Sequence, residues 1–291
     1  MRGIVVALAA TAAAALTAGC SAAAGDQPEE VPVLLRSTGL RLPLDAYLLS
    51  PGETTEVTEA HRVLVRRCMV RFGFDYPPVT AGGTGGGLTS WTQRRYGITD
   101  PTEAAARGYR LRAPADPAPS ADPGPQERVA LTGEGGSRIK GRAVPEDGCA
   151  GEAGRRLRAG GPEDVDRSLA QTLSAESYER SLQDKRVRAV TEQWSRCMAA
   201  NGLVYAGPLD PPKDRRFQGT APSTTERTTA KTDVNCKKRT NLVGIWFTAE
   251  TATQRSLIAR NHEALTRVAA MNRTELTTAR TVLSKFPSEN D

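Results

Sequence analysis

The sequence has few of the residues that common catalytic sites require. It contains two histidines, His61 and His262, and aromatic residues make up 5% of its 291 positions. No G-x-S-x-G nucleophile motif is present, and none of the five cysteines forms a C-x-x-C pair. An H-E-x-x-H pattern starts at His262 and Glu263 but fails at Thr266, and a zinc site needs at least three protein ligands. We therefore predict no metal, no cofactor and no catalytic residue, with both histidines packing beside apolar helix faces.

Two further short motifs lack the partners that would make them sites. Residues 82–87 spell G-G-T-G-G-G, but no P-loop lysine follows and the G-x-G-x-x-G spacing is absent. Ser137 and Lys140 form S-x-x-K, yet the nearest K-T-G sequence has Asp233 in place of glycine. A pair of carboxylates that works as acid and base leaves almost no local pattern. With 33 acidic residues, a hydrolase of that kind stays open as an alternative.

Long hydrophobic runs are missing except at the start of the chain. Residues 4–16 are apolar or small apart from Thr11 and follow Arg2, which is typical of a signal peptide. Thirteen residues are too few for a membrane span, which needs about 20. The run ends in L-T-A-G-C, which resembles the lipobox of bacterial lipoproteins, with Thr17 where leucine is usual. The resemblance implies that Cys20 receives a diacylglycerol and becomes the N-terminus after cleavage.

This processing predicts where the protein resides and what surrounds it. We expect a signal peptide at residues 1–19, a lipid-anchored tether at 20–35, and a body on the extracytoplasmic face of the cell membrane. Beyond residue 19 the chain has 38 basic and 33 acidic residues, and the two signs are interspersed. That distribution lacks the basic patch of nucleic-acid binders. The expected partners are the membrane, through the lipid on Cys20, and an anionic envelope component or a partner protein.

Four cysteines remain besides the lipidated one: Cys68, Cys149, Cys197 and Cys236. An even number in an exported chain predicts two disulfides, and four cysteines allow three pairings. Closing loops of this length stabilises a fold by about 4 kcal/mol per bond.

An internal repeat favours one of the three pairings. Residues 68–76 align without gaps on residues 197–205, and both share the pattern C-M-x-x-x-G-[FL]-x-Y. Each copy follows a helical pattern and precedes a proline. Each is later followed by an aspartate close before a cysteine, two residues before Cys149 at Asp147 and three before Cys236 at Asp233. We interpret the two copies as one duplicated unit, which favours pairing Cys68 with Cys149 and Cys197 with Cys236.

Apolar periodicity predicts the helices that carry the motifs. A helix capped by Thr54 or Thr55 should run to Phe72, and a second should end near residue 201. Gly73 and Gly202 should stop them as C-terminal caps. The residues expected on the two apolar faces are Val57, Ala60, Leu64, Cys68 and Phe72 in the first helix, and Val187, Val190, Trp194, Cys197 and Met198 in the second.

The rest of the chain divides into an irregular insertion and further helices. Residues 77–148 should be mostly linker, interrupted by one short helix that Asp100 caps and Gly108 closes. Helical periodicity returns at residues 163–182 and again, as one long stretch, at 246–283.

The paired C-M-x-x-x-G-aromatic motifs resemble a set of actinobacterial, Streptomyces-like lipoproteins of unknown function. Residues 42–51 and 94–98 match the same set. The resemblance implies architecture and location but no catalytic or ligand residues. We expect a mainly α fold of duplicated helical units with long irregular loops, tied by two disulfides. The first unit would span 36–160, with the insertion at 77–148, and the second 161–291, with C-terminal helices.

The function predicted from these features is that of a non-enzymatic binding or structural protein of the envelope. The alternatives are a carboxylate-using envelope hydrolase and a carrier of lipids or small molecules. A hydrolase would need two close carboxylates in a pocket, and a carrier would need an apolar cavity between helices.

Overall fold

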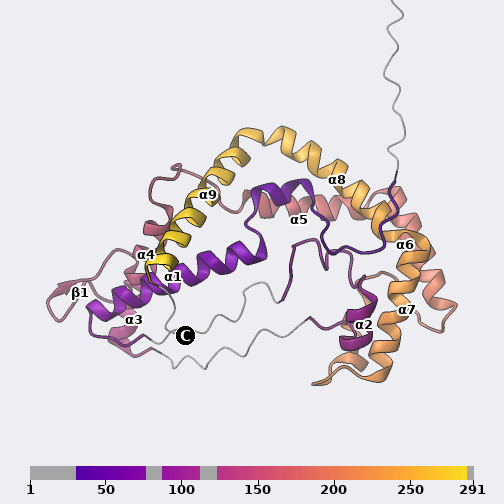
Figure 1. Ribbon diagram of the computed structural model, residues 1–291, viewed down its shortest axis with the longest axis horizontal. Coiled ribbons are helices and arrows are strands. Elements are labelled where there is room, and N and C mark those ends of the chain that lie inside the picture. Colours follow the sequence, from indigo (N-terminus) through magenta and orange to yellow (C-terminus); the bar gives the residue numbers. More distant parts are fainter. Residues whose placement is uncertain (1–30, 77–86, 112–122, 287–291) are drawn as a thin grey trace, which may run out of the picture. The chain divides into compact units, whose positions relative to one another are not determined.

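The computed structural model describes residues 31–76, 87–111 and 123–286, and Cys20 and the signal sequence lie outside them. Within these residues the fold is mainly helical and carries two disulfides, as predicted (Figure 1). The α-helices are α1 Pro51–Arg71, α2 Pro101–Arg107, α3 Pro125–Thr132, α4 Gly148–Arg158, α5 Leu169–Leu182, α6 Lys185–Ala199, α7 Thr224–Thr240, α8 Leu242–Arg260 and α9 His262–Lys285. Short 3-10 helices are η1 Pro43–Tyr47, η2 Pro211–Lys213 and η3 Arg215–Phe217, and one antiparallel hairpin joins β1 Arg138–Ile139 to β2 Arg142–Ala143.

One core lies where α1 and α4 pack against the C-terminal half of α9, and α3 packs on α1 and α4 (Figure 1). Its buried side chains include Leu64 and Met69 from α1, Leu157 from α4, and Ala279 and Val282 from α9. The apolar face predicted for the first helix is confirmed, because four of its five residues are buried and Val57 packs against the same core.

A second core lies between α6, α7 and α8. Trp194 and Trp246 are both buried there, and the ring of Tyr96 packs against Trp246 with centroids 5.3 Å apart. The apolar face predicted for α6 is confirmed, since Val187, Val190, Trp194 and Met198 are buried, whereas Cys197 is half-buried. Tyr96 comes from the 87–111 segment, which therefore packs among helices far from it in sequence.

Helices of the two predicted units pack against each other, both in the core around α1 and beside α7. Helix α9, from the second unit, completes the core around α1. Helix α2, from the first unit, packs on α7, where Ile98, Ala104 and Tyr109 form a small apolar cluster with Phe217 and Val234. The described residues from Val31 onward form one compact unit.

The two C-M-x-x-x-G motifs fold in the same way. In the first, the N–H of Gly73 donates to Val70 O and the N–H of Phe74 donates to Met69 O, at 2.9 and 3.2 Å. In the second, Gly202 donates to Ala199 O and Leu203 to Met198 O, at 2.9 and 3.1 Å. These bonds make the Schellman motif that ends many helices. Both glycines have positive φ, +81° and +73°, as the predicted caps require.

The segments that follow the two motifs differ. Cys149 lies at the start of α4, two residues after the exposed Asp147, whereas Cys236 lies inside α7, one turn after the buried Asp233. The likeness therefore covers the helix ends, and the duplication of a whole unit stays a prediction.

Several predicted boundaries are wrong. Helix α1 begins at Pro51 with Ser50 as its cap, because Ser50 Oγ accepts from Glu53 N while Glu53 Oε2 accepts from Ser50 N at 2.8 Å. The stretch predicted at 246–283 is two helices that meet at Asn261, and α5 starts six residues later than predicted. Helix α2, with its Asp100 cap and Gly108 end, is confirmed.

Besides the short 3-10 helices, the elements that were not predicted are α3, the hairpin, α4 and α7. Helix α7 has no clear apolar periodicity, because much of its buried face is polar. That face contains Glu226, Thr229, Asp233 and Lys237 as well as Ala230 and Val234. No helix within the described part of the chain is long and apolar enough to cross a membrane.

Candidate functional site

A cleft of about 320 Å³ lies between residues 41–53, the turn at 89–91 and the middle of α9. Its volume is at the small end of the range for small-molecule sites. The charged and polar side chains in its wall include Arg41, Asp45, Glu53, Ser90, Asn272 and Arg273. Apolar surface comes from Leu48, Leu49, Trp91 and Leu276.

The rim at residues 42–51 is made of two capped helix starts in succession. Pro43 opens η1, where Asp45 Oδ2 accepts a hydrogen bond from Leu42 N at 3.0 Å. Pro51 opens α1 after the Ser50 cap. Proline suits the first helical position because its missing N–H would have no partner there, and its fixed φ is already helical. The local sequence therefore favours this conformation of the rim.

Side chains from three distant segments fix the rim in place. Gln254 Oε1 on α8 accepts from Leu44 N at 2.8 Å. Asn272 Nδ2 on α9 donates to Tyr47 O at 2.9 Å, and Trp91 Nε1 donates to Leu49 O at 2.7 Å. Each bond satisfies a backbone group of the short η1 region. A rim held in this way is preorganised, which lowers the entropy cost of binding.

A buried charge network lies behind the rim. Glu250 on α8 is fully buried and pairs with Arg95, whose Nε lies 2.7 Å from Glu250 Oε1. Tyr96 and Ser177 donate to the same carboxylate at 2.9 and 3.1 Å. Burial, followed by the Glu250 charge, raises the pKa of Tyr96 well above its ordinary value. The network fixes the 89–97 segment, and thus Trp91, onto α5 and α8.

The two carboxylates in the cleft wall have pKa values shifted in opposite directions. Burial raises the pKa of Asp45 above its ordinary value, against the hydrogen bonds from Leu42 and Thr92. The backbone hydrogen bond from Ser50 lowers the pKa of Glu53. Arg41 lies near both and favours their charged forms.

Three polar side chains of the cleft form no hydrogen bond with another described residue. Arg41 and Arg273 are exposed, and neither forms a hydrogen bond or a close ion pair with another described residue. The hydroxyl of Ser90 is buried and likewise lacks a hydrogen-bond partner within the described residues. Buried polar groups without partners are uncommon in folded proteins. The cleft thus combines two guanidinium groups and a hydroxyl with an aromatic surface.

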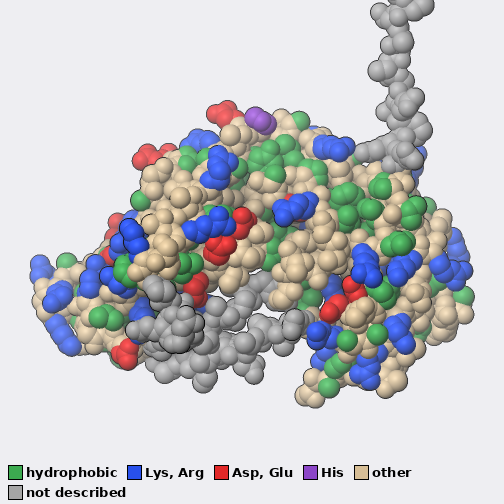
Figure 2. Space-filling view, viewed as in Figure 1, with side chains coloured by type: hydrophobic (Ala, Val, Ile, Leu, Met, Phe, Trp, Pro, Cys, Tyr) green, Lys and Arg blue, Asp and Glu red, His purple; other side chains and the backbone are tan. Residues whose placement is uncertain are grey.

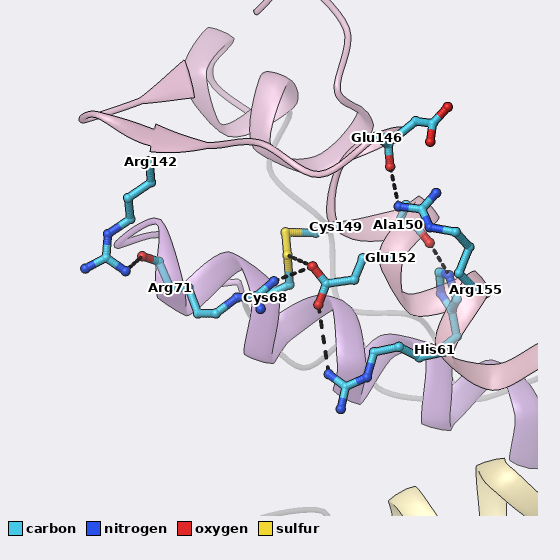
Figure 3. The surroundings of a disulfide bond; sticks show 10 residues. His61, Cys68, Arg71, Arg142, Glu146, Cys149, Ala150, Glu152 and Arg155 are labelled. Carbon is cyan, nitrogen blue, oxygen red and sulfur yellow. Dashed lines mark hydrogen bonds and ion pairs between the residues drawn. A yellow bond between two sulfur atoms is a disulfide. The ribbon is translucent and has the colours of Figure 1, made fainter. Parts of the chain in front are cut away.

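The four predicted disulfide cysteines pair as the repeat favoured, Cys68 with Cys149 and Cys197 with Cys236. Figure 3 shows the first bond, with Glu152 on α4 pointing toward it at 3.9 Å from Cys68 Sγ. The same carboxylate forms an ion pair with Arg71 at 2.5 Å. The bond joins the end of α1 to the start of α4 and is itself buried.

The histidines and the S-x-x-K motif lie away from the cleft. His61 is half-buried and its Nε2 donates to Ala150 O at 3.1 Å, which fits the predicted packing role (Figure 3). His262 is exposed at the start of α9, so the packing predicted for it is wrong. Ser137 precedes the hairpin and Lys140 lies in its turn, so the motif is not on a helix. Within the described residues no group of three metal-ligating side chains comes together.

Arg41, Trp91 and Arg273 were not predicted to belong to one site. They lie in three separate segments, and no spacing rule connects them. The resemblance noted for residues 42–51 concerns only the rim and carried no role for any residue.

No protein family matches this sequence, and no curated protein or solved structure shows significant similarity to it.

Proposed function

We propose that this chain is a lipid-anchored protein of the extracytoplasmic membrane face, and that its helical body binds a ligand of the cell envelope without catalysing a reaction. One observation carries the proposal: every cysteine within the described residues is in a disulfide. Disulfides persist in oxidising compartments outside the cytosol. This supports export, and the L-T-A-G-C sequence at Cys20 supports a lipid anchor.

The start of the body supports a short tether. Asn241, between α7 and α8, accepts from Leu34 N at 3.1 Å and donates to Pro32 O at 3.0 Å. Eleven residues separate Cys20 from Pro32, which gives a reach of at most about 40 Å. In this proposal the junction of α7 and α8 stays near the membrane.

The surface supports binding of a specific ligand over attraction to any polyanion. Figure 2 shows Lys and Arg side chains spread over the face of the molecule that is in view, with acidic side chains among them. A surface with mixed charges has no single strong field. Recognition then depends on a shaped site, and the cleft around Trp91 is such a site.

Lipid labelling tests the anchor. Cells expressing the full chain are grown with a clickable fatty-acid analogue, and the protein is purified and examined for label. We expect label on the wild-type protein and on Ser21→Ala, a neighbouring control, and none on Cys20→Ser. Label on Cys20→Ser, or an unlabelled wild-type protein with free thiols in the cytosol, would contradict the proposal.

A specific observation also favours a second candidate, an envelope hydrolase. Asp45 and Glu53 line one cleft, and their pKa values move apart, as they do in acid–base pairs. Both carboxylates, however, accept hydrogen bonds from the backbone N–H groups of helix starts. Because these hydrogen bonds give both carboxylates a structural role, we favour binding over hydrolysis. Release of reducing sugar from envelope polysaccharide, abolished in Asp45→Asn, would reverse that preference.

A further inference from the structure

We infer that the cleft around Trp91 binds a segment of saccharide chain, with one sugar ring against the indole and its hydroxyls held by Arg41 and Arg273. The inference rests on the proposed binding function and names the ligand of that site.

The aromatic surface is the first argument. Trp91 is 36% exposed and lines the cleft, while its only polar atom, Nε1, donates to Leu49 O at 2.7 Å. With the N–H engaged, the side chain offers the cleft only apolar ring surface. The bond also fixes the orientation of the ring. A fixed, flat apolar surface suits the C–H face of a sugar ring and costs little entropy on binding.

The polar groups are the second argument. Hydroxyl groups of a saccharide both donate and accept hydrogen bonds. Arg41 and Arg273 offer several N–H donors each and form no ion pair within the described residues. The buried hydroxyl of Ser90, which lacks a partner there, can donate or accept. These groups therefore match a polyol, because they supply donors around an aromatic surface.

The charges of the cleft argue against other ligands. Two guanidinium groups face two carboxylates, Asp45 and Glu53, so the wall carries no net charge that would select a polyanion. A lipid chain needs an enclosed apolar cavity. Here about half of the lining residues are polar, and charged side chains form part of the wall. A volume of about 320 Å³ would enclose only part of a longer saccharide chain, as expected for recognition of a polymer.

Tryptophan fluorescence reports binding at this site. Trp194 and Trp246 are buried, at 0% and 1% exposed, so a ligand in the cleft changes chiefly the emission of Trp91. The full mature protein in detergent micelles is titrated with a tetramer of β-1,4-linked N-acetylglucosamine and with one of glucose. A tetramer of galacturonic acid, an acidic peptide and phosphatidylglycerol vesicles complete the set. Calorimetry is run in parallel.

We expect a saturable emission change with at least one neutral tetramer. Trp91→Ala and Arg273→Gln should each weaken binding about tenfold, through loss of stacking and of charged hydrogen-bond donors. Trp91→Phe keeps a ring, so binding measured by calorimetry should stay within about threefold while the emission change disappears. Arg188→Gln removes another exposed arginine, from α6, and should leave affinity unchanged.

Melting curves show whether each variant is folded. The inference is overturned if no saccharide binds to the folded wild-type protein, or if Arg188→Gln weakens binding as much as Arg273→Gln. It is also overturned if the peptide or the vesicles occupy the cleft in preference to every saccharide. These results leave the fatty-acid labelling of Cys20 unaffected, so failure of this inference and failure of the anchor are distinguishable.

Discussion

Replacing Lys237 by methionine tests how the buried polar face of α7 is stabilised. Lys237 Nζ lies 3.0 Å from Asp233 Oδ2 and 3.0 Å from Ile98 O. The side chains of Lys237 and Asp233 are almost fully buried. Asp233 Oδ1 accepts from Trp194 Nε1 at 2.8 Å. Burial raises the pKa of Asp233 and lowers that of Lys237, while each opposes the shift of the other. Methionine keeps most of the side-chain volume and removes the ammonium group.

The expected loss follows from the charge that is left behind. Removing one partner of a buried ion pair costs about 3–5 kcal/mol, because the other charge stays buried without compensation. For a body of this size, that corresponds to a fall in Tm of about 6–20 °C. Denaturant unfolding of the oxidised protein at pH 7 measures the free energy of unfolding directly.

The pH dependence provides a second check. Without the ammonium, burial raises the pKa of Asp233 further above its unfolded value. A carboxyl group whose pKa is raised in the folded state contributes its full stability below the unfolded pKa, about 3.9, and loses it as the pH rises through the folded pKa. The loss in free energy of unfolding caused by Lys237→Met should therefore be largest near pH 7 and smaller near pH 4.

A double variant separates charge from packing. In Asp233→Asn combined with Lys237→Met, no charge is buried and Trp194 keeps an acceptor, so the double variant should be more stable than Lys237→Met alone. The reasoning is refuted if Lys237→Met loses less than about 1 kcal/mol, or if the double variant is the less stable of the two.

Four further variants have expected outcomes. Gly202→Ala should cost about 1–2 kcal/mol of stability from its positive φ alone, since a Cβ there meets nothing within 4 Å. Gly97→Ala should cost more by thermal unfolding, because its Cβ would lie 2.6 Å from a buried ammonium and 3.0 Å from a backbone carbonyl; equal losses would contradict this. Joint replacement of Cys197 and Cys236 by serine should cost about 4 kcal/mol in denaturant unfolding, from a closed loop of 39 residues; an unchanged midpoint would be against it. Ser50→Ala should lower stability by about 1 kcal/mol through loss of the α1 cap, and no change in Tm would indicate that another group caps the helix.

The parts of the fold predicted correctly depend on near neighbours in the chain. The ends of α1 and α6 follow from a glycine five residues after a cysteine, because only that residue adopts the left-handed turn of a Schellman motif without strain. The apolar faces of the same helices follow from three- and four-residue spacing. The cysteine pairing followed from the alignment of the two motifs.

Helix α7 was missed because its buried positions are polar. Periodicity reveals a helix when its hidden face is apolar, but here Asp233 and Lys237 satisfy each other inside the protein, and Glu226 accepts from Tyr109 N at 3.1 Å. Such compensation requires partners from α6 and from the residues on either side of α2, which no window of sequence around α7 contains. The helical periodicity predicted at 246–283 is present as α8 and α9, and the pattern did not mark the division at Asn261.

The sequence by itself determined the helical class and the helix ends at Gly73 and Gly202, because these depend on residue type and local spacing, and the alignment of the two motifs favoured one of the three disulfide pairings. Only the tertiary structure brought Arg41, Trp91 and Arg273 to one cleft, and only it decided which charges are buried. The physical reason is that a binding surface forms where separate segments pack together, so the side chains that face one another are set by the packing of the whole chain.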